Sequence, residues 1–153
     1  MSDRTPPSQA TTLRCHPVRV LSFGYLHTTT APQADLTFDV RRYLRDPAAI
    51  QGANLLDSNG HDPAVKQVVL ATPGAITTLA VATMFAARFP TDRPCTVAFG
   101  CAGGRHRSAA LAELLAARLT EMGVPVTVRH LHIALPRVLR TTDDTSAVDG
   151  GDR

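Results

Sequence analysis

The stretch CTVAFGCAGGRHRSAALAELLAARL, residues 95–119, decides the fold class of this chain. Residues 95–99 are continuously apolar, which is typical of a strand inside a parallel sheet. A glycine-rich loop follows, and then a helix is predicted from leucines at helical spacing. Gly123 and Pro125 end that helix, and residues 126–133 have the composition of another strand. The sequence therefore predicts one βαβ unit with a right-handed crossover.

The amino-terminal half adds two short strands and one helix to this unit. Residues 18–23 and 35–40 are predicted strands, and residues 41–65 are a long connection with one helical turn. Residues 73–89 predict a mostly buried helix. We expect a single α/β domain with a mixed or mostly parallel sheet flanked by helices and a glycine-rich strand-to-helix phosphate loop. Some side chains are expected to share a face: Val18, Val20 and Ser22 in the first strand, and Ile76, Leu79, Ala80 and Phe85 in the helix.

The composition of the chain indicates where the folded domain lies and which classes of protein are excluded. We expect disorder in residues 1–13 and in an acidic tail, 141–153, with the domain at 14–140. The formal net charge is +3, and the four aspartates of the tail leave the positive excess on the domain. Three cysteines do not indicate a disulfide framework. Without a secretory signal or an apolar run long enough for a membrane span, we expect a cytoplasmic location and no membrane partner.

The loop after residue 99 has the chemistry of a phosphate site. Glycines let backbone N–H groups approach an anion, and a helix amino terminus favours negative charge. Arg107 can bind phosphate oxygens through a bidentate guanidinium contact. Ser108 is expected to cap the helix and donate its hydroxyl, and His106 is expected to bind an oxygen or move a proton. Neither the nucleotide P-loop nor the Gly-x-Gly-x-x-Gly fingerprint fits the spacing. The predicted phosphate-binding residues are Ala102, Gly103, Gly104, Arg105, His106, Arg107 and Ser108.

An alternative interpretation of the same loop is catalytic. Cys101, Arg107 and Ser108 form the Cys-x5-Arg-Ser pattern of cysteine-dependent phosphatases. A thiolate at a helix amino terminus has a lowered pKa and could attack phosphorus. However, Gly100 stands where those enzymes usually have histidine, and the acid is undetermined among Asp39, Asp57 and Asp62. We favour Cys101 as a small semi-buried residue and expect no catalysis.

Ordered motifs resemble those of the carboxy-terminal domain of the RapZ family of RNase adapter proteins. The helix start FGCAGGRHRSAALAELLAARL is similar to that family's Gly-Cys-Thr-Gly-Gly-(Lys/Gln)-His-Arg-Ser. SFGYLH (22–27), DLTFDVRRYLRDP (35–47) and VRHLHI (128–133) follow the family's order. The resemblance covers residues 18–140. Ala102 replaces the family's threonine, and Arg105 replaces its lysine or glutamine.

The resemblance implies a sensor or adapter that binds a phosphorylated metabolite, either an amino-sugar phosphate such as glucosamine-6-phosphate or a nucleotide. It also implies contact with RNA and self-association, or a partner protein with a nucleotide-binding domain. That P-loop domain of the family has no counterpart here, so nucleotide hydrolysis is not expected. The implied ligand-pocket residues are His27, Asp39, Arg41, Arg129 and His130, and the RNA candidates are Arg41, Arg42, Arg45, Arg137 and Arg140.

We predict no cofactor and no metal. His130 and His132 are expected on the same side of a strand, but two histidines without a nearby carboxylate or cysteine pair are weak support for a metal site.

Overall fold

A computed structural model describes residues 16–42, 44, 50 and 52–138, which form an α/β domain around one parallel sheet. The segments 1–13 and 141–153, predicted to be disordered, lie outside these residues. The four strands run in the order β2-β3-β1-β4. The registers place Val18 opposite both Cys95 and Val126. The strands are β1 (Val18–Gly24), β2 (Leu36–Asp39), β3 (Cys95–Cys101) and β4 (Val126–His130).

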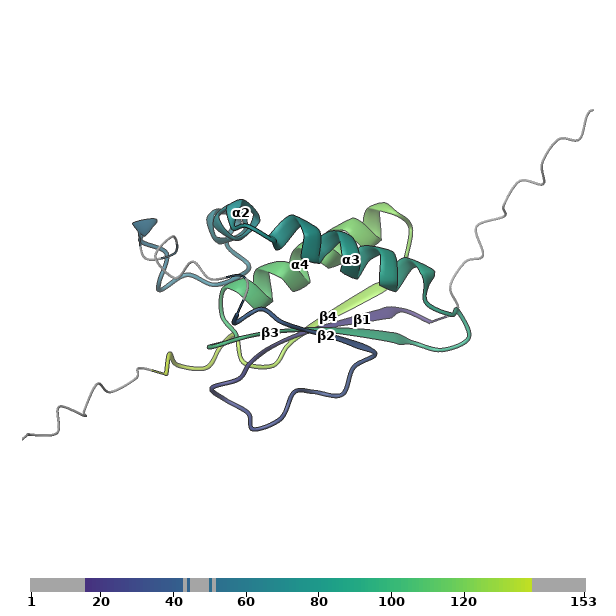
Figure 1. Cartoon of the computed structure of the whole chain (residues 1–153), viewed down its shortest axis with the longest axis horizontal. Helices are drawn as coiled ribbons and strands as arrows, with labels where there is room; N and C mark the ends of the chain where they lie inside the picture. The colour runs from purple at the N-terminus through teal and green to yellow at the C-terminus, as the bar shows by residue number, and fades with distance from the viewer. Residues whose placement is uncertain (1–15, 43, 45–49, 51, 139–153) are drawn as a thin grey trace, which may run out of the picture.

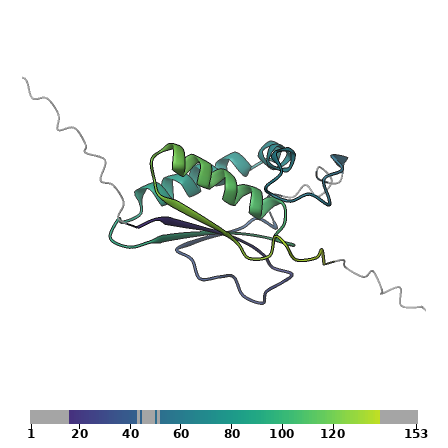
Figure 2. The same cartoon turned by 180° about the vertical axis from the view of Figure 1, so that it is seen from behind.

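Within the described residues, the helices α2, α3 and α4 lie on one face of the sheet (Figure 1). They are α2 (Pro63–Ala71), α3 (Ala75–Arg88) and α4 (Arg107–Glu121). Right-handed crossovers that step across a sheet in opposite directions must pass over opposite faces. The connections from β2 to β3 and from β3 to β4 step one way, and both carry helices. The connection from β1 to β2, residues 25–35, steps the other way and crosses the other face without a helix, as the two opposite views show (Figure 2).

The core lies between the sheet and the helices. Val18, Val20 and Ser22 are fully buried, which confirms that they share one face of β1 and shows that this face lies in the core. Leu111, Leu115 and Leu119 follow at intervals of four residues and are also fully buried. Gly123, at φ 74°, follows the end of α4 in the left-handed conformation that glycine adopts readily.

Helices flank the sheet as expected, and those in the described residues lie on one face of it. Two other sequence-based expectations about the helices were wrong. The segment 41–65, predicted to be a connection, includes the start of α2. Asp62 caps that helix by accepting a hydrogen bond from the Ala64 amide at 2.8 Å, and Pro63 lies in its first turn. Ile76 is 62% exposed and Ala80 is exposed as well, because the buried side of α3 is formed by Ala75, Thr78, Leu79, Ala82 and Ala86.

None of the helices in the described ranges is by itself long and apolar enough to cross a membrane. Helices α2 and α3 reach that length and composition only as a pair, and the pair is bent by 100°.

Candidate functional site

The loops that leave β1 and β3 lie in backbone contact at the carboxyl edge of the sheet. The ladder continues past both strands, because the Tyr25 and Leu26 amides donate to the carbonyls of Cys101 and Ala102 at 2.9 and 3.0 Å. A Cβ on Gly24 would lie 2.5 Å from the carbonyl carbon of Gly103. Only glycine at position 24 permits this approach, so the glycine-rich loop is held directly against the end of β1.

The start of α4 differs from the predicted cap. The helix begins at Arg107 after His106, whose side chain makes no capping hydrogen bond. Ser108 lies two positions after the N-cap residue, inside the first turn, and its Oγ is 3.1 Å from Sγ of Cys101. The Gly104 amide donates to the same sulfur at 3.2 Å. Both the cysteine and the serine are buried, and their contacts with each other and with the Gly104 amide stabilise the base of the loop.

Two arginines tie the loop to neighbouring segments. Arg107 donates to the Leu44 carbonyl at 2.6 Å. Arg105 donates to the carbonyls of Leu135 and Asp57, each at 3.2 Å. A guanidinium has five N–H donors, so these contacts position both groups while leaving further donors on each.

Three buried side-chain nitrogens within the described residues have no hydrogen-bond partner: Nε2 of His27, Nε of Arg105 and Nε2 of His106. All three belong to predicted site residues in the loops after β1 and β3. Burial is the main cause that lowers the pKa of His106, and the Arg105 charge lowers it further, whereas hydrogen bonding of the ring with the backbone of Leu55, Leu56 and Ser58 acts in the opposite direction. Burial, followed by the charge of His27, also lowers the pKa of His132, whose Nδ1 accepts from the Gly24 amide at 2.9 Å. These imidazoles therefore favour the neutral form.

Two residues of the implied ligand pocket pair with each other. Arg41 donates through Nε and Nη2 to the two carboxylate oxygens of Asp39 at 2.9 and 2.6 Å. Its guanidinium also lies 3.6 Å from the centre of the Tyr25 ring. The hydrogen bond from Arg41 is the main cause that lowers the pKa of Asp39. Beside this group, residues 25–29 line a hollow of about 580 Å³, which includes His27.

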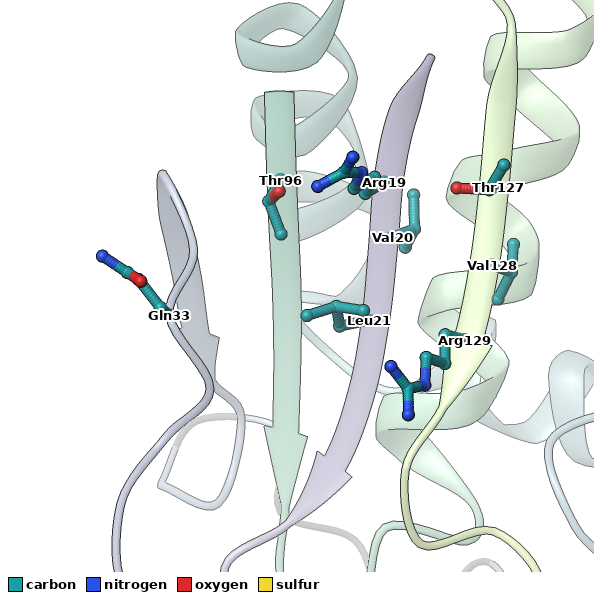
Figure 3. A pocket seen from close by; sticks show the side chains of 8 residues that line it. All are labelled: Arg19, Val20, Leu21, Gln33, Thr96, Thr127, Val128 and Arg129. Carbon is teal, nitrogen blue, oxygen red and sulfur yellow. The ribbon is translucent and has the colours of Figure 1, made fainter. Parts of the chain in front are cut away.

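The structure places two further implied pocket residues on opposite faces of the sheet. Arg129 lies on the face without helices, where it lines a concavity of about 530 Å³ together with Arg19 (Figure 3). His130 follows it in β4 and so points to the helix side. There its Nδ1 is 2.6 Å from Ser22 Oγ, and its Nε2 is 2.8 Å from Glu113 Oε1. These two neighbours do not share one pocket.

Comparison with known proteins identifies the family. The sequence model described as the RapZ C-terminal domain matches residues 16–134. The chain belongs to the RapZ C-terminal domain family. This domain is 40% identical over 117 residues to a nucleotide-binding protein of Frankia alni, covering 72% of the chain and 39% of that protein. It is also 40% identical over 126 residues to a nucleotide-binding protein of Mycolicibacterium smegmatis, covering 78% of the chain and 42% of that protein. The domain thus spans about two fifths of these relatives.

Two residues that were not predicted to belong to a site, His61 and Glu113, lie beside His130 in this RapZ C-terminal domain. His61, in the loop before α2, has its Nδ1 3.6 Å from Glu113 Oε1. Nothing local in the sequence links His61 to Glu113 or His130. The one usable signal was Glu113 itself, a single acidic residue within the leucine-rich helix pattern. By contrast, His132 takes part in the Gly24 contact and does not join His130.

Proposed function

We propose that this domain binds a small phosphorylated molecule, an amino-sugar phosphate or a nucleotide, at residues 102–108 and acts as a sensor or adapter. The observation that carries the proposal is the set of three unpartnered nitrogens on His27, Arg105 and His106. A buried polar group without a partner costs about 1–3 kcal/mol. Ligand oxygens and hydroxyls would offset that cost, and the three groups belong to the two loops that meet at the carboxyl edge of the sheet.

The start of α4 supports the phosphate as the anchoring group. The first N–H groups of a helix have no partner within the helix, and they carry a partial positive charge. His106 precedes α4 without a side-chain cap, so these groups are not satisfied by a side chain of that residue. Arg105 and Arg107, the residues before and after His106 in the sequence, add two guanidinium groups. A guanidinium binds phosphate oxygens through paired hydrogen bonds.

The surroundings of His27 support a polar group attached to the phosphate. The hollow lined by residues 25–29 adjoins the pair formed by Asp39 and Arg41 through Tyr25. A carboxylate accepts hydrogen bonds from sugar hydroxyls or an ammonium group. Nucleotides are the second ligand class, because the relatives are named nucleotide-binding proteins, although the chain covers about two fifths of each.

The test is calorimetric titration with glucosamine-6-phosphate, glucosamine, AMP and inorganic phosphate. We expect binding of at least one phosphorylated compound and at least tenfold weaker binding by Arg105→Gln and His106→Gln. Arg118→Gln is the matched control, because Arg118 lies at the opposite end of α4. The proposal is wrong if no phosphorylated ligand binds, or if Arg105→Gln and His106→Gln both retain the wild-type Kd.

Cys101→Ser separates binding from the phosphatase alternative. The thiol is 3% exposed and already contacts Gly104 and Ser108, so a serine of similar size should preserve ligand affinity within about threefold. Turnover of an aryl phosphate by the wild type that disappears in Cys101→Ser would replace the binding proposal with a catalytic one.

RNA contact is a second candidate, favoured by the sheet face that the helices leave open. Arg19 and Arg129 line its concavity together with Gln33, Thr96 and Thr127 (Figure 3). Such a surface would bind RNA through phosphates, so affinity should fall linearly with salt on logarithmic axes. Arg129→Gln should flatten that slope by about 0.7 for single-stranded RNA. Unchanged slopes in Arg129→Gln and Arg19→Gln would exclude this face. Of the RNA candidates from the sequence, Arg45 and Arg140 lie outside the described residues.

A further inference from the structure

Three side chains that are far apart in the sequence meet beside α4, on the helix-covered side of the sheet. His61 comes from the loop before α2, Glu113 from the second turn of α4, and His130 from the end of β4. One nitrogen or oxygen from each lies within 4.8 Å of the other two. We propose that this group, the His61–Glu113–His130 cluster, is a binding site for a divalent transition-metal ion of the zinc class.

The spacing of the ligand atoms fits such an ion. Nε2 of His130 lies 2.8 Å from Oε1 of Glu113, and Nδ1 of His61 lies 3.6 Å from the same oxygen. Ligands about 2.0–2.2 Å from a tetrahedral zinc are about 3.3–3.6 Å from one another. All three ligand atoms lie within 4.8 Å of one another, so a shift of about an ångström would bring every pair to the tetrahedral spacing. His61 is 54% exposed on a loop, so it can make most of that adjustment.

A buried hydroxyl orients the least exposed ligand. Oγ of Ser22 is 2.6 Å from Nδ1 of His130, and Ser22 is fully buried. This contact engages one ring nitrogen and leaves Nε2 facing Glu113. A hydrogen bond on the far nitrogen is the usual way in which proteins fix the tautomer and orientation of a metal-binding imidazole. The site opens to solvent on the His61 side, where water would complete a four-coordinate shell.

The donor set and the local charge select the class of ion. Two imidazoles and one carboxylate suit zinc and similar first-row ions, whereas magnesium and calcium prefer oxygen ligands. Lys66 is the other charged group at the cluster, with Nζ 3.8 Å from Oε2 of Glu113. Its ammonium would repel a dication, so removing this charge should strengthen binding.

The experiment is titration of the full chain with zinc chloride, by calorimetry and by thermal denaturation. We expect one ion per chain, at least tenfold weaker binding by His61→Gln and Glu113→Gln, and tighter binding by Lys66→Gln. Magnesium chloride should have no effect. His16→Gln is the matched control, because His16 is an exposed histidine outside the cluster.

His61→Gln is the decisive variant, since an exposed loop residue is not required for folding. Wild-type affinity in both His61→Gln and Glu113→Gln, or the absence of one-to-one binding by the wild type, would overturn the metal site. The three side chains would then form a hydrogen-bonded pair with a neighbouring imidazole. Neither result bears on phosphate binding, which is measured with different ligands and variants.

Discussion

The glycine-rich loop precedes α4 and the His61–Glu113–His130 cluster includes a residue of that helix, yet the two sites are built in opposite ways. Residues 101–108 are consecutive in the chain, and the loop is shaped by close backbone contact. The three members of the cluster are far apart in the sequence and are joined by side chains. The loop therefore depends on which residues lack a side chain, whereas the cluster depends on which strand lies beside which.

The most severe test of the loop is Gly24→Ala. The added Cβ would lie 2.5 Å from the backbone of Gly103, and neither chain segment can move without breaking the ladder between the loops. We expect a loss of about 3 kcal/mol in the free energy of unfolding. Chemical denaturation measures it. Gly103→Ala is the matched control, because its Cβ would meet nothing within 4 Å and should cost less than about 1 kcal/mol. Equal losses in the two variants would contradict the importance of backbone contact.

Ser22→Ala tests the cluster with a smaller expected effect. It removes the hydroxyl partner of His130 inside the core and should cost about 1–2 kcal/mol in the free energy of unfolding. It should also weaken zinc binding, because the ring loses its fixed orientation. Thr127→Ala, on the exposed face of the neighbouring strand β4, is the control and should be nearly neutral. An unaltered zinc affinity in Ser22→Ala would separate the serine from the metal site.

The pH dependence of stability tests the loop again, and its effect should be smaller than that of Ser22→Ala. The pKa values of His106 and His132 are lowered in the folded state, so the unfolded chain binds more protons as the pH falls below about 6.5. Stability should therefore decrease from pH 6.5 downward, through the folded pKa values. His106→Gln should reduce this slope, as thermal unfolding at several pH values would measure. A slope identical to that of the wild type would show that His106 is as easily protonated in the folded protein as in the unfolded chain.

The smallest effect on the free energy of unfolding is expected for Arg41→Ala, which serves as a reference for the three larger effects. Its ion pair with Asp39 has bidentate geometry but lies at the surface, where the two side chains are 42% and 35% exposed. Such pairs contribute about 0–1 kcal/mol. Denaturation in low and high salt would measure the contribution. A loss above 2 kcal/mol would mean that the contact with Tyr25 is more important than the ion pair.

Sequence reasoning succeeded where neighbouring residues carry the signal. The βαβ unit from β3 to β4 was confirmed because Leu111, Leu115 and Leu119 repeat at helical spacing between two apolar strands. It failed at α2, whose first residues were assigned to the connection at 41–65, although proline after a capping aspartate is typical of a helix start. It also failed for Ile76, because the apolar repeat of α3 does not by itself say which side faces the sheet.

Adjacent or regularly spaced residues were enough to assign the family, a mixed or mostly parallel sheet and the position of the glycine-rich loop. Only the tertiary structure decided that β4 lies beside β1, which brings His130 to Ser22 and, across α4, to Glu113 and His61. It also decided that Arg129 and His130 face opposite sides of the sheet. The physical reason is that crossover connections join strands that are distant in sequence, so the identity of a strand's neighbour is set by how the helices pack and not by local pattern.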